Sequence, residues 1–467
     1  MPANSWPEND SYNELDPLNS LLSDISIAED LQAEVEMNDL SLPSRFQSRR
    51  CKAALVLTLV WSGTVALNLI SWGSLFVLGL TTILSLHALV TVFTKPRENT
   101  SQIQGGFPQV SLMVAAKNEE AVISNITYNL CNLDYPSGKY EVWIVDDNSS
   151  DRTPQLLATL AEQYANLKVF RRSPDAGGGK SGALNQILPL TKGEILAVFD
   201  ADAQVRSDIL QQVIPIFGRE KVGAVQVRKA IANVNTNFWT RGQMAEMALD
   251  AYMQQQRAAI GGIGELRGNG QFVRRQALLS CGGWNEGTIT DDLDLTLRLH
   301  LSRWDINFIL FPAVFEEGVT QLISLWHQRS RWAEGGYQRY LDYWDLILRN
   351  RMGVRKTWDL LMFAITMYIF PMAAVPDLIM AIIKHRLPLF IPISSLTVIM
   401  SLNGMFHGLR RIYQDKSFRA SDYLRILLQT LQGTLYMLHW FVVVSATTVR
   451  MSVRPKSLKW VKTIHQG

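Results

Sequence analysis

Two blocks near the ends of the chain are apolar and nearly free of charge. The first, residues 53–94, contains no Asp, Glu, Lys or Arg over 42 positions. Because a helix of about 20 apolar residues crosses a bilayer, this block is long enough for two spans joined by a turn at residues 71–74; the alternative is a buried hairpin. Basic residues such as Arg50 and Lys95 flank it on both sides, which predicts a hairpin with both ends in the cytoplasm.

The second block holds three charge-poor stretches, residues 360–383, 387–409 and 426–449. Each is long enough to span a membrane. Three spans would leave the C-terminal tail outside, whereas its basic residues favour the cytoplasm. The number of spans and the charge of the tail would agree if one stretch were re-entrant or interfacial and did not cross the membrane. We expect this of residues 360–383, because Pro371, Pro376 and Asp377 interrupt them.

Between the blocks, short apolar runs alternate with amphipathic segments, which predicts an α/β fold with a mainly parallel sheet covered by helices on both faces. Polar clusters follow several of the runs, where ligands bind in such sheets. Strands are expected at 110–116, 140–145, 167–170 and 194–199, and helices at 119–130 and 153–164.

The first 40 residues contain ten acidic and no basic residues, a composition that does not support a packed core. The predicted organisation is an acidic disordered segment (1–50), a two-span hairpin (51–96), a cytosolic catalytic domain (97–348), a membrane block of two or three spans (349–450) and a basic cytosolic tail (451–467).

Composition excludes two broad classes. A formal net charge of +3 argues against a nucleic-acid binder that works by general basicity. Cys51, Cys131 and Cys281 are far apart and odd in number, which excludes a disulfide framework or a cysteine-rich zinc site.

Acidic residues follow two of the predicted strands. Asp200 and Asp202 come directly after residues 194–199, where two carboxylates can hold Mg²⁺ or Mn²⁺ together with substrate phosphates; a helix cap or solvated turn is the alternative. Asp146 and Asp147 follow residues 140–145 and could accept hydrogen bonds from a nucleoside, whereas residues 149–153 are explained by helix capping alone.

Three further motifs carry candidate chemistry. The glycine run before Lys180 and Asn185 suits an anionic ligand, although it lacks the P-loop spacing and could be only a mobile loop. Asp291 and Asp292 repel each other, which can raise one pKa toward that of a general base; acids at a helix start are the alternative. The last motif consists of Gln328, Arg331 and Trp332. Arg331 could pair with a pyrophosphate and Trp332 could stack on a sugar or acceptor; the alternative is a basic and aromatic anchor beside the membrane.

The order of these motifs along one chain resembles a membrane-embedded family-two glycosyltransferase of the GT-A fold, a Rossmann-like domain flanked here by transmembrane helices. The resemblance implies that Glu119 and Asp147 hold the uridine and that Asp202 and Asp200 hold the divalent metal. It places the catalytic base on Asp292, next to Asp291 where the family has Glu. It also assigns donor and acceptor binding to Gln328, Arg331 and Trp332.

Within that family, the acidic leader, the hairpin and the length are similar to the cyanobacterial β-monoglucosyldiacylglycerol synthases. This implies an inverting transfer of glucose from UDP-glucose to diacylglycerol by a multi-pass protein of the cell or thylakoid membrane. We expect residues 237–241 and the membrane helices to present the acceptor. The alternatives are a processive polysaccharide synthase and a non-catalytic nucleotide-sugar-binding membrane protein.

Overall fold

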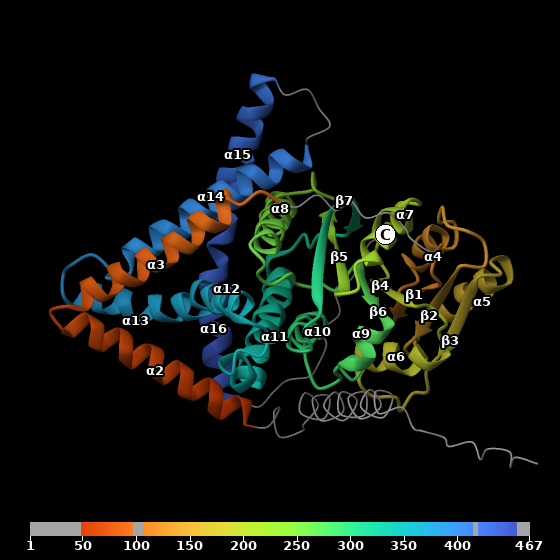
Figure 1. Ribbon diagram of the computed structural model, residues 1–467, viewed down its shortest axis with the longest axis horizontal. Coiled ribbons are helices and arrows are strands. Elements are labelled where there is room, and N and C mark those ends of the chain that lie inside the picture. The colour runs from red at the N-terminus through yellow and green to blue at the C-terminus, as the bar shows by residue number, and fades with distance from the viewer. Residues whose placement is uncertain (1–47, 97–105, 414–418, 455–467) are drawn as a thin grey trace, which may run out of the picture. The chain divides into compact units, whose positions relative to one another are not determined.

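The computed structural model describes residues 48–96, 106–413 and 419–454. Most of the predicted acidic segment and of the predicted basic tail lies outside these residues. In the described part, the first apolar block forms two helices, α2 (Arg49–Leu69) and α3 (Gly73–Phe93), joined by the expected turn (Figure 1).

The soluble part is built on a seven-stranded sheet with the order β3-β2-β1-β4-β6-β5-β7. Its pairings are parallel except where β6 lies antiparallel between β4 and β5. The predicted α/β fold is therefore confirmed, with one reversed strand. The strands are β1 (Val110–Ala116), β2 (Tyr140–Asp146), β3 (Leu167–Arg171), β4 (Ile195–Phe199), β5 (Val222–Ile231), β6 (Gln271–Arg274) and β7 (Asp305–Glu316).

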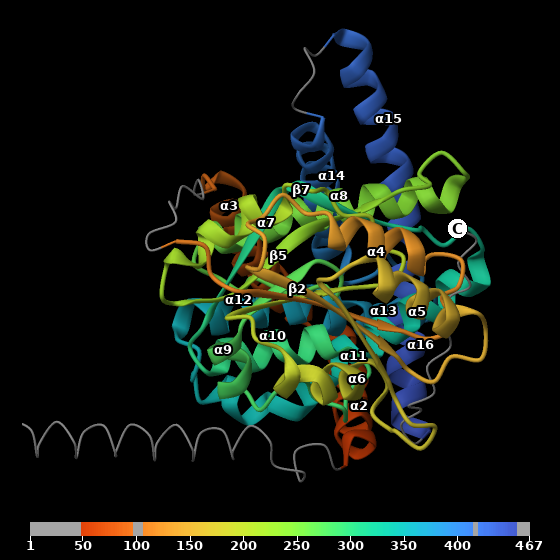
Figure 2. The ribbon, with the colours of Figure 1, turned by 90° about the vertical axis from the view of Figure 1, so that its right-hand side faces the viewer.

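Helices cover both faces of this sheet, because successive strand residues point to opposite sides. Leu112 of β1 joins the core on one face and Met113 joins the core on the other. Figure 2 shows α4 and α7 above the strands and α6, α9 and α10 below them. These helices are α4 (Ile123–Cys131), α5 (Thr153–Gln163), α6 (Gly179–Ile187), α7 (Ile209–Val213), α9 (Arg275–Ser280) and α10 (Asp291–Leu301).

The register of the strands brings the predicted polar clusters to one edge. Ala116 at the end of β1 pairs with Asp146 at the end of β2, and Val114 of β1 pairs with Phe199 at the end of β4. The residues that follow these strands therefore emerge together, although the ends of β1 and β4, Ala116 and Phe199, lie 83 positions apart in sequence.

The remaining helices pack beside the sheet and away from it (Figure 1). Among these helices, α14 contacts α3 and α13 contacts α2. The helices are α8 (Phe238–Ala259), α11 (Leu322–Leu348), α12 (Val354–Ala364), a π turn (Ile365–Ile369), α13 (Phe370–Ile383), α14 (Ile391–Ile412), α15 (Ala420–Met437) and α16 (His439–Val453).

Four helical runs of the described chain are long and apolar enough to cross a membrane: Arg49–Leu69, Gly73–Phe93, Val354–Ile383 and Ala420–Val453. The segment expected to be re-entrant thus belongs to a continuous 30-residue run, while α14 does not reach the same hydropathy.

Proline and aspartate do not interrupt the Val354–Ile383 run as the sequence suggested. The π turn Ile365–Ile369 comes just before Pro371 and widens the helix where the proline ring would otherwise crowd the preceding turn. Asp377 is buried and accepts hydrogen bonds from the Nδ2 of Asn68 (3.0 Å) and from the backbone N–H groups of Leu389 (3.0 Å) and Phe390 (2.9 Å). This acid therefore satisfies N–H groups just before α14 rather than breaking α13.

Candidate active site

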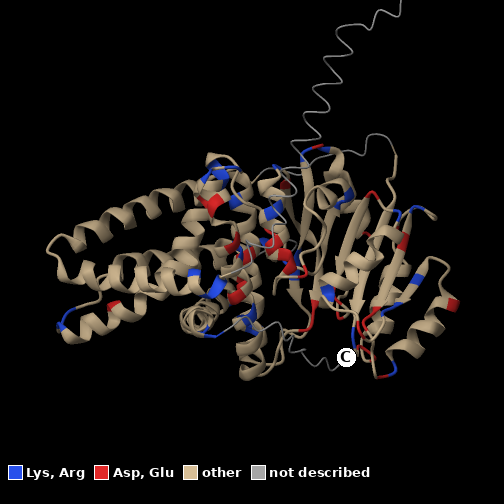
Figure 3. Cartoon of the chain, turned by 90° about the horizontal axis from the view of Figure 1, so that it is seen from below, with Lys and Arg blue, Asp and Glu red and all other residues tan. Residues whose placement is uncertain are grey.

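One cavity of about 1010 Å³ lies between the carboxyl edge of the sheet and the helices. In Figure 3 many red and blue segments of the ribbon, which mark acidic and basic residues, lie between the sheet and the long outer helices, and those helices are mostly tan. The cavity collects nine of the twelve residues singled out from the sequence. They are Glu119, Lys180, Asp200, Asp202, Asp291, Asp292, Gln328, Arg331 and Trp332.

The two acids after β4 present oxygen donors to this cavity. Asp200 forms an ion pair with Lys180, which holds the pKa of Asp200 below its usual value although burial acts in the opposite direction. Asp202 accepts a hydrogen bond from the backbone N–H of Glu317 (3.1 Å). Among the described residues no set of three His, Cys, Asp or Glu side chains forms a metal cage. Two carboxylates nevertheless suit Mg²⁺ or Mn²⁺, because substrate phosphates supply the other ligands.

The second pair of acids opens α10. Asp291 and Asp292 lie in its first turn. Burial, reinforced by the neighbouring charge of Asp291, raises the pKa of Asp292 to about 6, against the effect of the Leu293 N–H group that donates to it. A carboxylate with this pKa is suited to accept a proton near neutral pH.

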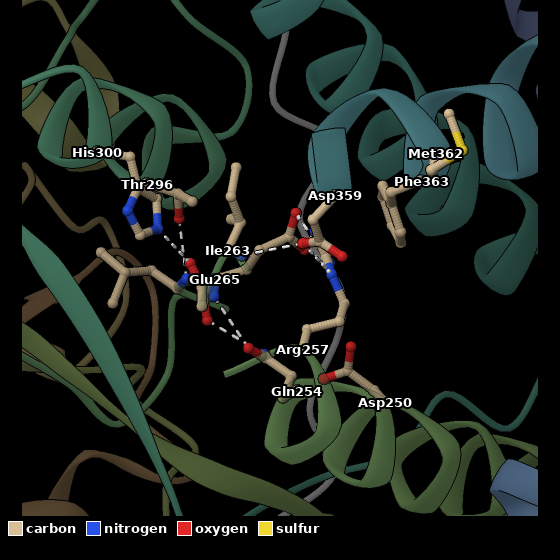
Figure 4. Close-up of polar contacts among 12 residues, drawn as sticks. Asp250, Gln254, Arg257, Ile263, Glu265, Thr296, His300, Asp359, Met362 and Phe363 are labelled. Carbon is tan, nitrogen blue, oxygen red and sulfur yellow. Dashed lines mark hydrogen bonds and ion pairs between the residues drawn. The ribbon is translucent and has the colours of Figure 1, made fainter. Parts of the chain in front are cut away.

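An irregular segment, residues 263–267, runs close to this base, and side chains hold it in place (Figure 4). Four of its backbone N–H groups donate to side chains from four different elements, which fixes a loop that has no ladder of its own. The pairs are Ile263 with Asp359 of α12 (2.9 Å), Glu265 with Gln254 of α8 (2.9 Å), Leu266 with Thr296 of α10 (2.8 Å) and Arg267 with Gln226 of β5 (2.7 Å).

This anchoring delivers Arg267 to the site. Its guanidinium pairs with Asp250 (2.6 Å) and with the fully buried Glu265 (2.7 Å). It also lowers the pKa of Asp292, although less than burial raises it. Gly268, with a φ of +81°, follows at once, and a Cβ there would lie 3.4 Å from Oδ2 of Asp292. The loop therefore approaches the base closely and places a fixed cation beside it.

Helix α11 carries the motif Gln328, Arg331 and Trp332 to the same cavity as the two acidic pairs. Arg331 lines the cavity; burial lowers its pKa, and Asp200 and Asp292 oppose that effect. The neighbouring Arg329 is buried, pairs with Glu246 (2.6 Å) and stacks on the ring of Trp332 at 4.0 Å. One arginine thus faces the cavity while the other holds the aromatic ring in place.

A glycine of α11 permits the close packing of this helix on α10. A Cβ at Gly335 would lie 2.1 Å from Oγ1 of Thr290, the residue just before α10. A Cβ at Gly336 would lie 2.0 Å from the hydroxyl of Tyr368 in the π turn. A side chain at position 335 would push α11, which carries Arg331, away from the start of α10, which carries Asp292, and one at position 336 would push α11 away from the π turn.

Comparisons with known proteins agree with this architecture. A family model described as "Glycosyltransferase like family 2" matches residues 108–335. A mannosyltransferase from Pyrobaculum calidifontis, solved with GDP-Man and Mn²⁺, covers 85% of this chain and 99% of its own at 17% identity with a TM-score of 0.52, a likeness of fold alone.

Sequence relatives are much closer. The β-monoglucosyldiacylglycerol synthase of Trichormus variabilis is 70% identical over 467 residues, which cover 100% of this chain and 99% of that protein. The synthase of Synechocystis is 53% identical over 473 residues, covering 100% and 97%. The chain belongs to the β-monoglucosyldiacylglycerol synthase family. The four apolar helical runs are compatible with membrane association.

Three residues expected at the nucleotide lie outside the cavity lining of this family member. Asp147 is held by an ion pair with Arg172. Asp146 is 1% exposed and accepts from the backbone N–H of Ser149 (2.9 Å). Asn185 binds the backbone of Trp284 on both sides, donating to its carbonyl (2.8 Å) and accepting from its N–H (2.9 Å). Asp146 and Asn185 thus shape the surrounding loops in this structure rather than facing the cavity.

The acceptor segment expected at residues 237–241 is also placed differently. Asn237 caps α8 by accepting from the N–H groups of Trp239 (3.0 Å) and Thr240 (3.1 Å), and Phe238 packs against Tyr436 of α15. The part of α8 that lines the cavity lies farther along, from Glu246 to Arg257.

Sequence reasoning missed several lining residues because no motif marks them. Lys229 of β5 pairs with Glu316 of β7 (3.0 Å) and lies 5.3 Å from the ring of Trp332. Asp250 and Arg267 likewise come from unremarkable stretches. Only Gly335 and Gly336 left a signal, since a glycine pair shortly after Arg331 and Trp332 inside a helix indicates close packing.

Proposed function

We propose that the protein transfers glucose from UDP-glucose to the free hydroxyl of 1,2-diacylglycerol and gives β-monoglucosyldiacylglycerol. The observation that carries this proposal is one continuous cavity with two kinds of lining. One end is lined by carboxylates suited to bind a metal ion, by a candidate general base and by cations, and the other end is lined by apolar helices. A water-soluble donor and a lipid acceptor need such a pair of environments. The names of the 70% identical relatives agree with this activity.

The donor diphosphate belongs at the polar end. Asp200 and Asp202 would hold Mg²⁺ or Mn²⁺, which neutralises charge on the leaving diphosphate when bound. Lys180 and Arg331 line the same region and would add fixed positive charge there. Glu119 lines the cavity and follows β1, whose end pairs with the end of β2 just before Asp147, so we assign the uridine to this side.

Asp292 would act as the general base. As the acceptor oxygen attacks the anomeric carbon, its proton passes to the Asp292 carboxylate, and the bond from the anomeric carbon to the UDP oxygen breaks. Attack opposite the leaving group inverts the configuration, so an α-linked donor gives a β-glucoside. The raised pKa of Asp292 makes it a stronger base than an exposed aspartate.

We further propose a multi-pass protein with its catalytic domain in the cytoplasm. The predicted boundaries, 51–96 and 349–450 for the membrane blocks and 97–348 for the catalytic domain, remain part of this proposal. Its support is the four apolar helical runs and the basic residues at the sheet-side ends of α2 and α3, such as Arg50 and Lys95.

Product analysis tests the function. Membranes containing the protein are incubated with labelled UDP-glucose, diacylglycerol and Mg²⁺, with UDP-galactose as a parallel donor and Asp292→Asn as the control. We expect label in a chloroform-soluble monoglucosyl lipid, absent from the control. An insoluble polymer would instead indicate a polysaccharide synthase, and unimpaired function in Asp292→Asn would indicate a non-catalytic sugar-nucleotide binder.

A further inference from the structure

The cavity does not end at the catalytic acids. It continues between α3, α8, the α12–π turn region and α14, where its lining becomes apolar. We call this part the apolar arm and define it by Leu84, Met253, Met362, Met367, Leu396 and Met400.

The lining of the arm is rich in methionine. Four of its six defining residues are Met, an unbranched side chain that adapts to occupants of irregular shape. Met367 lies in the π turn, a widened helical turn of the kind that recurs at functional sites. The arm therefore suits a long flexible apolar group rather than a rigid one.

Charged groups near the arm neutralise one another. Asp359 of α12 pairs with Arg257 of α8 (2.9 Å) and lies 3.5 Å from His87 of α3 (Figure 4). Arg257 also stacks on the ring of Phe363 at 4.5 Å. Because buried charges need such partners, the pairing lets an apolar occupant lie beside them without separating an ion from its counterion.

The Asp250–Arg267 pair lines the same cavity, and Gly268, the next residue, approaches the base so closely that a Cβ there would lie 3.4 Å from Oδ2 of Asp292. A group that enters from the arm thus meets the base at the point where the lining turns polar. This matches an acceptor that has a hydroxyl at one end and a hydrocarbon chain behind it.

We propose that the apolar arm binds an acyl chain of the diacylglycerol acceptor and so selects chain length while directing the glycerol hydroxyl to Asp292. The proposal rests on the proposed function. Of the possible apolar occupants, the acyl chain is favoured because the arm and the catalytic end form one continuous cavity, so the occupant has to be part of the reacting molecule.

Chain-length selectivity tests the arm. Met400→Trp fills it, so kcat/KM for dioleoylglycerol should fall roughly tenfold relative to dioctanoylglycerol. Ile399→Trp is the matched control, because Ile399 is the next residue on α14, does not line the cavity and is 60% exposed. It should keep the wild-type ratio. Each variant's UDP affinity is measured in parallel and should not change.

A second variant keeps the test valid if Met400→Trp fails to fold. Met400→Ala enlarges the arm and should raise the relative rate for acceptors with branched acyl chains. An unchanged acceptor ratio in both Met400 variants, or an equal shift in Ile399→Trp, overturns the proposal. Wild-type protein that glucosylates neither diacylglycerol would instead refute the proposed function itself, so the two failures are distinguishable.

Discussion

The two ends of the cavity are built in different ways. The key carboxylates of the polar end stand where a strand ends or a helix begins: Asp202 follows β4, and Asp292 lies in the first turn of α10. The apolar arm is made from the sides of helices, with Leu84 from the N-terminal block and Met400 from the C-terminal block. Short motifs with fixed spacing thus specify the first, whereas only the packing of distant helices creates the second.

This difference predicts different responses to substitution. At the polar end each group has one position and one charge, so a change of a single atom can abolish the reaction. In the apolar arm the contacts are numerous and individually weak, so substitutions should alter preference more than rate. The predictions below run from the largest effect to the smallest.

Asp292→Asn should lower kcat by about 10²- to 10⁴-fold, the range for loss of a general base, while UDP still binds. The variant should also be more stable at pH 7 than the wild type. The pKa of Asp292 in the folded protein is raised above that of an unfolded aspartate. At pH values above this raised pKa the ionised carboxylate therefore lowers the free energy of unfolding, and the neutral amide removes that destabilisation. Thermal unfolding in detergent measures the shift; a lower midpoint would contradict this account of the pKa.

Gly335→Ala should reduce kcat by about 100-fold, because its Cβ would lie 2.1 Å from Oγ1 of Thr290 and must displace α10 against α11. Gly63→Ala in α2 is the matched control, since a Cβ there meets nothing within 4 Å. Steady-state rates of the two variants decide the matter. Equal, near-wild-type rates would show that the contact between these helices does not position the base.

The pH–rate profile should sharpen the role of the paired acids. The base works only when ionised, so the rate should fall as pH drops through about 6, the raised pKa of Asp292. Asp291→Asn removes the neighbouring negative charge and should move this acid limb to lower pH. The limb should stay above the ordinary aspartate range, because burial is the larger cause. A limb that does not move would assign it to another group.

Asp377→Ala tests the distal helices, far from the reaction. It leaves the Nδ2 of Asn68 and the N–H groups of Leu389 and Phe390 without this acceptor, at a cost of about 1–3 kcal/mol in unfolding free energy. The rate at a permissive temperature should change less than about twofold. Ser394→Ala, which removes a hydroxyl that donates to the carbonyl of Phe390 (3.1 Å), is the milder comparison. A large loss of kcat in Asp377→Ala would show that this end is coupled to catalysis.

Much of the polar end could be predicted from the sequence, since parallel strands end at one edge and the motifs directly follow them. Residues beside the motifs were harder to assign. Asp146 and Asn185 look like ligands in the sequence, yet the Ser149 N–H donates to one carboxylate oxygen of Asp146, and the backbone of Trp284 binds the amide of Asn185. Polarity at a strand end shows that a residue has partners, but not whether the partner is a ligand or the protein itself.

The sequence by itself determined the alternating α/β domain, the apolar blocks and most of the acids and cations of the polar end, because hydrophobic period and motif spacing are local properties of the chain. Only the tertiary structure decided that α3, α8, α12 and α14 enclose an apolar arm, that the loop carrying Arg267 and Gly268 approaches Asp292, and that Asp377 satisfies N–H groups of another segment. Those features join residues up to several hundred positions apart, and no local pattern encodes which helix face meets which.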